Sequence, residues 1–343
     1  MTAPLEKNPG FAGRRGLLVL VIMDGVGYGK YRDGDAFANA LTPVLDKLTL
    51  EHPHTQLKAH GTAVGLPSDE DMGNSEVGHN AIGCGRVYAQ GAKLVTGALE
   101  SGALFKGSVW KKLIANVKNK NSSLHFIGLF SDGNVHSHLD HLKGMMDKAA
   151  LEGVARIRVH ALLDGRDVGE TSALEYIDPF EEYLAEHREK GRDFRLASGG
   201  GRMVITMDRY GANWDMVRRG WETHVLGEGR RFGSAHEAVE TLRAETQAID
   251  QDLPPFVIAG GDGPVGPVLD GDSVIFFNFR GDRALEITAA FEKADFNKFD
   301  RKRYPQAEYA GMMEYDGDLK IPRQFLVDPP AIDRTMSEFL CAT

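Results

Sequence analysis

Cysteine is scarce in this sequence, and positive charge does not dominate it. The two cysteines, Cys84 and Cys341, are too few for a disulfide framework, and no CxxC pair is present. We therefore expect a reducing compartment and predict a cytoplasmic location. The formal net charge of −9 argues against a nucleic-acid-binding protein that depends on bulk positive charge. An acidic chain can still bind an anion through a local basic pocket.

Long hydrophobic runs are also missing. The apolar run LLVLVIM, residues 17–23, is 7 residues long, whereas a membrane-spanning helix needs about 20. Residues 1–16 lack the apolar core of a signal peptide. We predict no membrane association and interpret residues 17–23 as a fully buried strand.

The sequence has ample material for a core. It is 343 residues long and 42% hydrophobic, which predicts two domains. Residues 228–256 read as a polar helical connection. Strand patterns alternate with helical patterns, and two of the runs break on glycine; the strands are expected at 123–130, 156–163, 194–201, 256–261 and 272–279, and the helices at 42–52, 138–153 and 171–191. This alternation predicts an α/β protein with a mainly parallel sheet.

Polar side chains follow the expected strands, and ligands of parallel α/β sheets bind beyond the carboxyl ends of strands. Asp24 follows the first run, in the segment DGVGYG. It can hold a metal ion or orient a base. It can equally cap a turn, because Asp-Gly is ordinary turn chemistry.

A cluster of imidazoles follows the run at 123–130. Asp132, His136, His138 and His141 lie within ten residues, in SDGNVHSHLDH. Histidines this close can ligate zinc. The alternative that we favour is one catalytic histidine whose neighbours face solvent. His136 lies in the loop and is the predicted general acid or base, while His138 and His141 fall on the start of the next helix.

Arginines follow three further strands. Each lies beside or close to glycine or aspartate. The five are Arg166, Arg202, Arg209, Arg280 and Arg283. Arg166 lies between Asp164 and Asp167. A single arginine of this kind is usually a surface ion pair. Five of them at corresponding positions predict a pocket for a phosphate or carboxylate group, which guanidinium groups bind with paired hydrogen bonds.

Ser75 lies in DMGNSEVGHNAIGCGR, residues 71–86. This stretch matches neither the GxSxG elbow nor a P-loop. Ser75 can be the N-cap of a helix that follows it. It can also be a nucleophile, because a helix N-terminus stabilises an attached phosphate. A serine hydroxyl needs a base or a metal to activate it for this role. Asp24 is a possible metal ligand for this purpose if the two loops meet.

Taken in order, the motifs resemble those of the cofactor-independent phosphoglycerate mutases. They are VIMDGVGYG, DMGNSEVGHNAIGCGR, SDGNVHSH, DGRD, GGGRMVITMDRY and NFRGDRA, and they cover nearly the whole chain. The wording around Ser75 is similar to the plant, bacterial and trypanosomatid type. The resemblance implies an alkaline-phosphatase-like, mainly parallel sheet, of which residues 1–88 are the N-terminal part. An inserted α/β phosphotransferase domain at 89–312 and a return segment at 313–343 would follow.

The resemblance also implies roles for the site residues. Ser75 would be the nucleophile that carries phosphate between 3-phosphoglycerate and 2-phosphoglycerate, without 2,3-bisphosphoglycerate. Asp24 and Ser75 would ligate one of two divalent metal ions, most commonly manganese, and Asn74 would position the phosphate. The residues expected to hold the small-molecule substrate are His136, Arg166, Asp167, Arg202, Arg209, Arg280 and Arg283. We expect a monomer.

The sequence departs from the family in one respect. The remaining metal ligands of the family, an Asp-x-x-x-His motif, an Asp-His dipeptide and a further His, lie downstream of the inserted domain, as does a lysine near the phosphate. This sequence ends at MSEFLCAT, about where that half begins, and Asp140-His141 falls in the inserted domain. We therefore expect an exposed apolar face on residues 1–88 and an inserted domain that folds alone.

Little or no mutase activity is expected of this chain by itself, because two oxygen ligands hold a transition metal poorly. Two alternatives stay open. The chain can be a short form that binds phosphoglycerate or a partner without catalysis. It can also be another member of the phosphatase superfamily, such as a phosphopentomutase or a phosphatase, although the long arginine motifs count against that.

Overall fold

The computed structural model describes residues 4–6, 8–13, 16–89, 91–261, 263–330 and 332–342. These residues form one nine-stranded sheet in the order β4-β5-β3-β2-β1-β7-β8-β9, with β6 paired to β5. Its strands are β1 (Leu124–Leu129), β2 (Arg156–Leu163), β3 (Asp193–Gly201), β4 (Arg230–Phe232), β5 (Phe256–Gly260), β6 (Gly263–Pro264), β7 (Ser273–Phe276), β8 (Glu308–Met313) and β9 (Phe325–Val327). Only the β3–β5 and β5–β6 pairs are antiparallel. The predicted α/β class with a mainly parallel sheet is confirmed.

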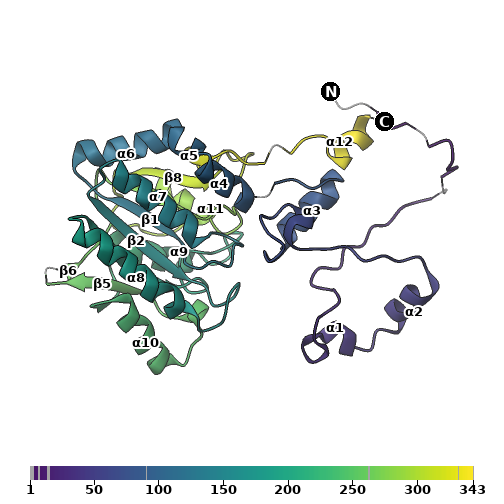
Figure 1. The fold of residues 1–343 in the computed structure, drawn as a ribbon, viewed down its shortest axis with the longest axis horizontal. Helices are drawn as coiled ribbons and strands as arrows, with labels where there is room; N and C mark the ends of the chain where they lie inside the picture. The colour runs from purple at the N-terminus through teal and green to yellow at the C-terminus, as the bar shows by residue number, and fades with distance from the viewer. Residues whose placement is uncertain are drawn as a thin grey trace.

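Helices cover both faces of this sheet, whereas α1, α2, α3 and α12 lie away from it (Figure 1). The helices of the described residues are α1 (Ala36–Asn39), α2 (Pro43–Glu51), α3 (Ser75–Cys84), α4 (Gly91–Glu100), α5 (Ala103–Lys106), α6 (Ser108–Lys120), α7 (Leu139–Leu151), α8 (Ala173–Glu189), α9 (Trp214–Trp221), α10 (Ala235–Thr246), α11 (Leu285–Glu292) and α12 (Met336–Ala342). None of the helices in the described part of the chain combines the length and apolar character that a bilayer span requires.

The core has two layers because side chains alternate along each strand. In β1, Phe126 packs into the layer formed with α4 to α8 and α10, whereas Ile127 packs into the layer formed with α9 and α11. Both side chains are fully buried. Strands that are buried on both faces read as mainly apolar runs, which is why β1 and β7 were predictable.

The predicted strand at residues 17–23 is wrong. These residues have no regular secondary structure, and the side chain of Leu17 is 98% exposed. A strand needs a neighbour to pair its backbone groups, and the described residues between 4 and 89 form no strand that could provide one. In Figure 1 this part of the chain extends away from the sheet.

The predicted break of a strand on glycine is also wrong for β3, which continues through Gly201. A Cβ atom on Gly199 would lie 2.5 Å from the ring of Phe256 in β5. Glycine is therefore needed there for close strand packing, and it does not end the strand. The sheet also extends past residue 312, because β9 pairs in parallel with β8. The domain division at 88 and 312 stays a prediction.

Candidate active site

The loops after β1, β2, β3 and β7 bring the predicted arginines to one edge of the sheet. These four strands are mutually parallel neighbours, so their carboxyl ends lie together. His136, in the loop after β1, is 3% exposed. Burial holds the pKa of His136 well below its usual range, and nearby positive charges lower it further; these charges are Arg202, Arg280, Arg283 and Arg166. One neutral imidazole therefore lies within electrostatic reach of four guanidinium groups.

His136 also has an unused ring nitrogen. Its Nδ1 atom is buried and has no hydrogen-bond partner among the described residues. The nearest carboxylate oxygen is Oδ1 of Asp282, at 3.7 Å. A buried nitrogen of this kind can act on a bound ligand.

Arg202 is the most enclosed of the arginines, at 1% exposed. Its Nη1 atom donates to Oδ1 of Asp164 at 2.7 Å and to Asp167. Asp164 in turn accepts a hydrogen bond from Ser131. Asp167, predicted to hold substrate, thus also fixes Arg202.

Arg283 is anchored by backbone. Its Nη1 atom donates to the carbonyl oxygen of Met207 at 2.7 Å. Burial lowers the pKa of Arg283, and the positive charges of Arg202 and Arg209 lower it further. Like charges gathered at low exposure favour a bound anion that neutralises them.

Asp282 is a residue that the sequence reasoning missed. Its carboxylate lies 3.2 Å from Nε of Arg280 and 3.8 Å from Nη1 of Arg209, in addition to the contact with His136. It therefore touches three groups that were predicted to hold substrate. Its place between two arginines in RGDR was the available signal.

Ser75 and Asp24 meet, although they are 51 residues apart. The hydroxyl of Ser75 donates to Oδ2 of Asp24 at 2.9 Å. Ser75 does not cap α3: Oδ1 of Asn74 accepts from the backbone N–H of Val77 at 3.2 Å, and Ser75 is the first helical residue. The interpretation of Ser75 as an N-cap is wrong, and its exposed hydroxyl lies at the helix N-terminus.

Two glycines shape the Ser75 segment. A Cβ atom on Gly73 would lie 1.8 Å from the carbonyl oxygen of Ala59, so two backbones touch there. Gly85 ends α3 with a φ of +63°, a left-handed conformation that favours glycine.

A cleft of about 480 Å³ joins the two parts of the site. It is lined by Ser75, Glu76, His79, Arg209, Tyr210, Arg280, Gly281, Asp282, Leu285 and Tyr315. His136, Arg202 and Arg283 are buried and do not line it, and neither does the exposed Arg166. The structure therefore brings Ser75 together with Arg209 and Arg280.

His138 and His141 lie apart from this cleft. Nδ1 of His138 accepts from the N–H of Asp140 and caps α7. His141 is 5% exposed and contacts Oγ1 of Thr96 at 2.8 Å, so the prediction that it faces solvent is wrong. Burial lowers the pKa of His141 to about 3. The described residues contain no group of three or more His, Cys, Asp or Glu side chains placed to hold a metal ion.

The fold and site define an α/β protein in which an arginine-rich pocket lies beside an exposed serine at a helix N-terminus. Residues 95–317 match the family described as the BPG-independent PGAM N-terminus. The chain belongs to this family, as the resemblance of its motifs predicted.

Known relatives are similar over nearly the whole chain. A probable 2,3-bisphosphoglycerate-independent phosphoglycerate mutase of Leptospira interrogans is 56% identical over 342 residues, which are 99% of this chain and 62% of that protein. The corresponding mutase of Trypanosoma brucei brucei is 54% identical over 326 residues, 94% of this chain and 59% of that protein. The chain thus spans less than two thirds of these relatives.

A solved structure has the same fold. The phosphoglycerate mutase of Leishmania mexicana, studied at low cobalt concentration, superimposes with a TM-score of 0.91 at 51% identity. The match covers 93% of this chain and 59% of that one.

Proposed function

We propose that this chain provides the nucleophile and the substrate pocket of a phosphoglycerate mutase, an isomerase of glycolysis and gluconeogenesis. The observation that carries the proposal is the cleft that Ser75 shares with Arg209 and Arg280. The names of the relatives support the same reaction, and they support independence from 2,3-bisphosphoglycerate. In this proposal residues 89–312 are the inserted phosphotransferase domain, and the protein is a monomer.

The proposed reaction transfers phosphate through serine. Oγ of Ser75 forms a bond to phosphorus while the bond from phosphorus to the 3-oxygen of glycerate breaks. The serine loses its proton, and the departing oxygen gains one. After the glycerate reorients, its 2-hydroxyl takes the phosphate back. Such a transfer depends on positioning and charge stabilisation, which clustered arginines supply.

Individual residues have distinct parts in this proposal. The N-terminus of α3 stabilises the phosphate on Ser75, and the side-chain nitrogen of Asn74 can donate to it, since Oδ1 is engaged in capping. His136 is neutral, and its buried Nδ1, which has no hydrogen-bond partner among the described residues, can form a hydrogen bond with a bound ligand. The other substrate-binding residues are Arg166, Asp167, Arg202, Arg209, Arg280 and Arg283.

Two divalent metal ions, most commonly manganese, are part of the proposal. The cobalt in the study of the Leishmania mexicana enzyme is consistent with a divalent-metal requirement. Asp24 and Ser75 present two oxygens 2.9 Å apart, which suit one hard or borderline cation. The described residues contain no group of three or more His, Cys, Asp or Glu side chains placed to hold either ion. The fit is therefore incomplete, and we expect little or no turnover from this chain alone.

Calorimetry with 3-phosphoglycerate tests the substrate pocket. We expect Arg280→Ala to weaken binding at least tenfold, because the charge-assisted contact is lost. Arg156→Ala, at the opposite end of β2, is the matched control and should bind like the parent chain. Binding that does not depend on Arg280, or no binding by the parent chain, would overturn the pocket assignment.

A binding function without catalysis is the second candidate, because no group of three or more His, Cys, Asp or Glu side chains among the described residues is placed to hold a metal. Tight, arginine-dependent binding without turnover in manganese supports it. Robust mutase turnover by the purified chain would overturn our metal assignment. A panel of phosphate esters separates a mutase from a phosphatase or phosphopentomutase, because a mutase interconverts the 2- and 3-phosphates without net hydrolysis.

We also propose a cytoplasmic location, on the basis of cysteine chemistry. Cys84 and Cys341 are both free, which suits a reducing compartment.

A further inference from the structure

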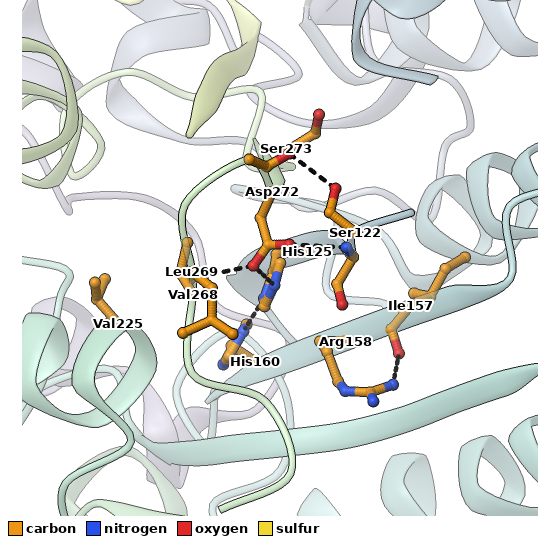
Figure 2. A network of polar contacts seen from close by, with 12 residues as sticks. Ser122, His125, Ile157, Arg158, His160, Val225, Val268, Leu269, Asp272 and Ser273 are labelled. Carbon is orange, nitrogen blue, oxygen red and sulfur yellow. Dashed lines mark hydrogen bonds and ion pairs between the residues drawn. The ribbon is translucent and has the colours of Figure 1, made fainter. Parts of the chain in front are cut away.

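Six buried polar side chains form a continuous chain of hydrogen bonds across the sheet, on the face covered by α9. Figure 2 shows its first part, from Asp272 through His125 to His160. The remaining members are Ser198, His224 and Thr206, and every member is at most 3% exposed. The successive contacts are 3.0, 3.0, 2.7, 2.7 and 3.1 Å, from Asp272 to Thr206.

The charged end of the chain is Asp272, next to the start of β7. Burial pushes its pKa upward, but hydrogen bonds from His125 and from the N–H groups of Ser123 and Leu269 outweigh this effect and hold the pKa below its usual value. Asp272 is therefore an acceptor only. It must receive the Nε2 proton of His125.

Hydrogen positions along the chain follow from that end. Burial lowers the pKa values of His125 and His160 and lowers that of His224 to about 3, so all three rings are neutral and each donates from one nitrogen only. His125 donates from Nε2 and must accept at Nδ1 from Nε2–H of His160. His160 then accepts from the hydroxyl of Ser198.

The donors and acceptors from Ser198 to Thr206 are fixed in the same way. Oγ of Ser198 donates to His160 and accepts from Nδ1–H of His224, so Nε2 of His224 is an acceptor. Thr206 is 3.1 Å from this nitrogen and is therefore the donor. Every donated proton in this chain of hydrogen bonds points from Thr206 toward Asp272.

Thr206 itself has a strained backbone. Its φ is +67°, which is rare for a β-branched residue. The N–H of Met207 donates to the carbonyl of Ile205 at 2.7 Å, so Thr206 is the centre of a γ-turn, and a positive φ is the rare and strained form of that turn. Such a conformation persists only where its surroundings determine it. Here they are the bond to His224 and a bond from the Thr206 N–H to the carbonyl of Met216.

This turn leads directly into the candidate active site. The carbonyl of the next residue, Met207, accepts from Arg283. Arg209 follows two residues later and lines the cleft with Ser75. The direction of the polypeptide backbone after Thr206 therefore sets the positions of both guanidinium groups.

We propose that Thr206 and His224 are positioning residues, which the buried chain anchors to Asp272 and which hold Arg209 and Arg283 in the anion pocket. This inference rests on the proposed function, because it assigns the two arginines to phosphoglycerate. Neither Thr206 nor His224 touches the substrate; each acts through the strained turn.

Two substitutions at one position test the proposal. Thr206→Val keeps the shape but removes the donor, leaving Nε2 of His224 buried and unpaired, and we expect about tenfold weaker binding of 3-phosphoglycerate in calorimetry. Thr206→Ser keeps the donor and should bind within about twofold of the parent chain. Parent-like binding by Thr206→Val, or an equal loss in Thr206→Ser, would overturn the proposal.

Thermal unfolding separates positioning from a purely structural role. Affinities are measured well below the Tm of each variant, where a structural role alone would lower Tm and leave the Kd unchanged. That combination in Thr206→Val counts against the proposal.

Ring nitrogen NMR of the parent chain supplies a test that needs neither a variant nor a ligand. We expect the proton on Nδ1 in His224 and on Nε2 in His125 and His160. A proton on Nε2 of His224 would overturn the inference even if phosphoglycerate binds. Absence of phosphoglycerate binding by the parent overturns the proposed function and the positioning role with it, whereas the expected tautomers still support the buried chain.

Discussion

The carboxylate of Glu76 lies 3.0 Å from Nε of Arg280. The residue directly after Ser75 thus reaches the loop that follows β7. The two groups are close but not aligned as a hydrogen bond, since Nε of Arg280 has no hydrogen-bond partner among the described residues. Burial raises the pKa of Glu76 even though Arg280 opposes the shift. Glu76 therefore occupies a guanidinium edge that a phosphate group would use.

Replacing Glu76 should strengthen anion binding. Glu76→Gln removes the negative charge that competes for Arg280, and we expect 3-phosphoglycerate to bind about three- to tenfold more tightly, an effect that weakens with added salt. Calorimetry at two ionic strengths measures it. Glu70→Gln, an exposed glutamate in the same segment, should leave the affinity unchanged. Equal or weaker binding in Glu76→Gln contradicts the competition.

Arg202 should be essential for stability as well as for binding. Arg202→Met leaves Asp164 and Asp167 without their shared cation, and removing one partner of a buried pair costs about 3–5 kcal/mol of unfolding free energy. Urea denaturation measures the loss. Arg195→Met removes an exposed pair with Asp193 and should cost about 1 kcal/mol or less. Similar losses in the two variants would show that Arg202 is not held as described.

Gly220 should tolerate no side chain. A Cβ atom there would lie 2.1 Å from Oγ1 of Thr206 and 2.9 Å from its backbone nitrogen. Gly220→Ala must displace the strained turn, and overpacking of this kind costs about 1–3 kcal/mol. Gly97→Ala, in α4 with open space around the new methyl group, should instead stabilise the chain by about 0.5–1 kcal/mol. Thermal unfolding of the pair checks the contrast.

Much of the sheet was predictable because local apolar runs indicate buried strands. The runs that became β1 and β2 have neighbours in the same sheet, whereas residues 17–23 have the same pattern and pair with no described strand. Hydrophobicity indicates that a segment prefers burial, but the pairing partner lies elsewhere in the chain. Gly199 of β3 was misinterpreted for a related reason, since the ring of Phe256 that excludes a side chain there belongs to another strand.

The candidate site was predictable where residues follow strand ends. Topology brings His136 and the arginines together, so the position of each in the sequence sufficed. Glu76 was missed because its partner, Arg280, lies on a distant loop. The chain of hydrogen bonds from Asp272 to Thr206 was missed because its members come from several elements and have no fixed spacing in the sequence.

The exposed run at residues 17–23 should be the first site of limited proteolysis. Thermolysin cuts before apolar residues, and Leu17 and Leu18 are 98% and 94% exposed. The similarly apolar β1 is buried in the sheet and serves as the internal control. Mass spectrometry of early fragments should locate cuts within 17–23 and none within β1. Early cleavage of β1 would contradict the described packing.

Stability should fall as the pH is lowered below neutrality, because several histidines are buried in the neutral form. Burial lowers the pKa of His141 to about 3 in the folded chain. A histidine in the unfolded chain has a pKa of about 6.5. Between these values the unfolded chain binds a proton that the folded chain does not. Each such histidine therefore lowers the unfolding free energy by about 1.4 kcal/mol per pH unit as the pH falls.

His141→Gln isolates one of these protons, because glutamine can keep the contact with Thr96 but cannot titrate. The slope of unfolding free energy between pH 6 and pH 4 should become shallower by about 1.4 kcal/mol per unit, measured by urea denaturation across that range. The half-buried His236 is the opposite case: its hydrogen bond to Asp178 raises its pKa, so it stabilises the chain as the pH falls through that value. His236→Gln should leave the slope nearly unchanged or slightly steeper. An unchanged slope in His141→Gln means that this imidazole is not buried in neutral form.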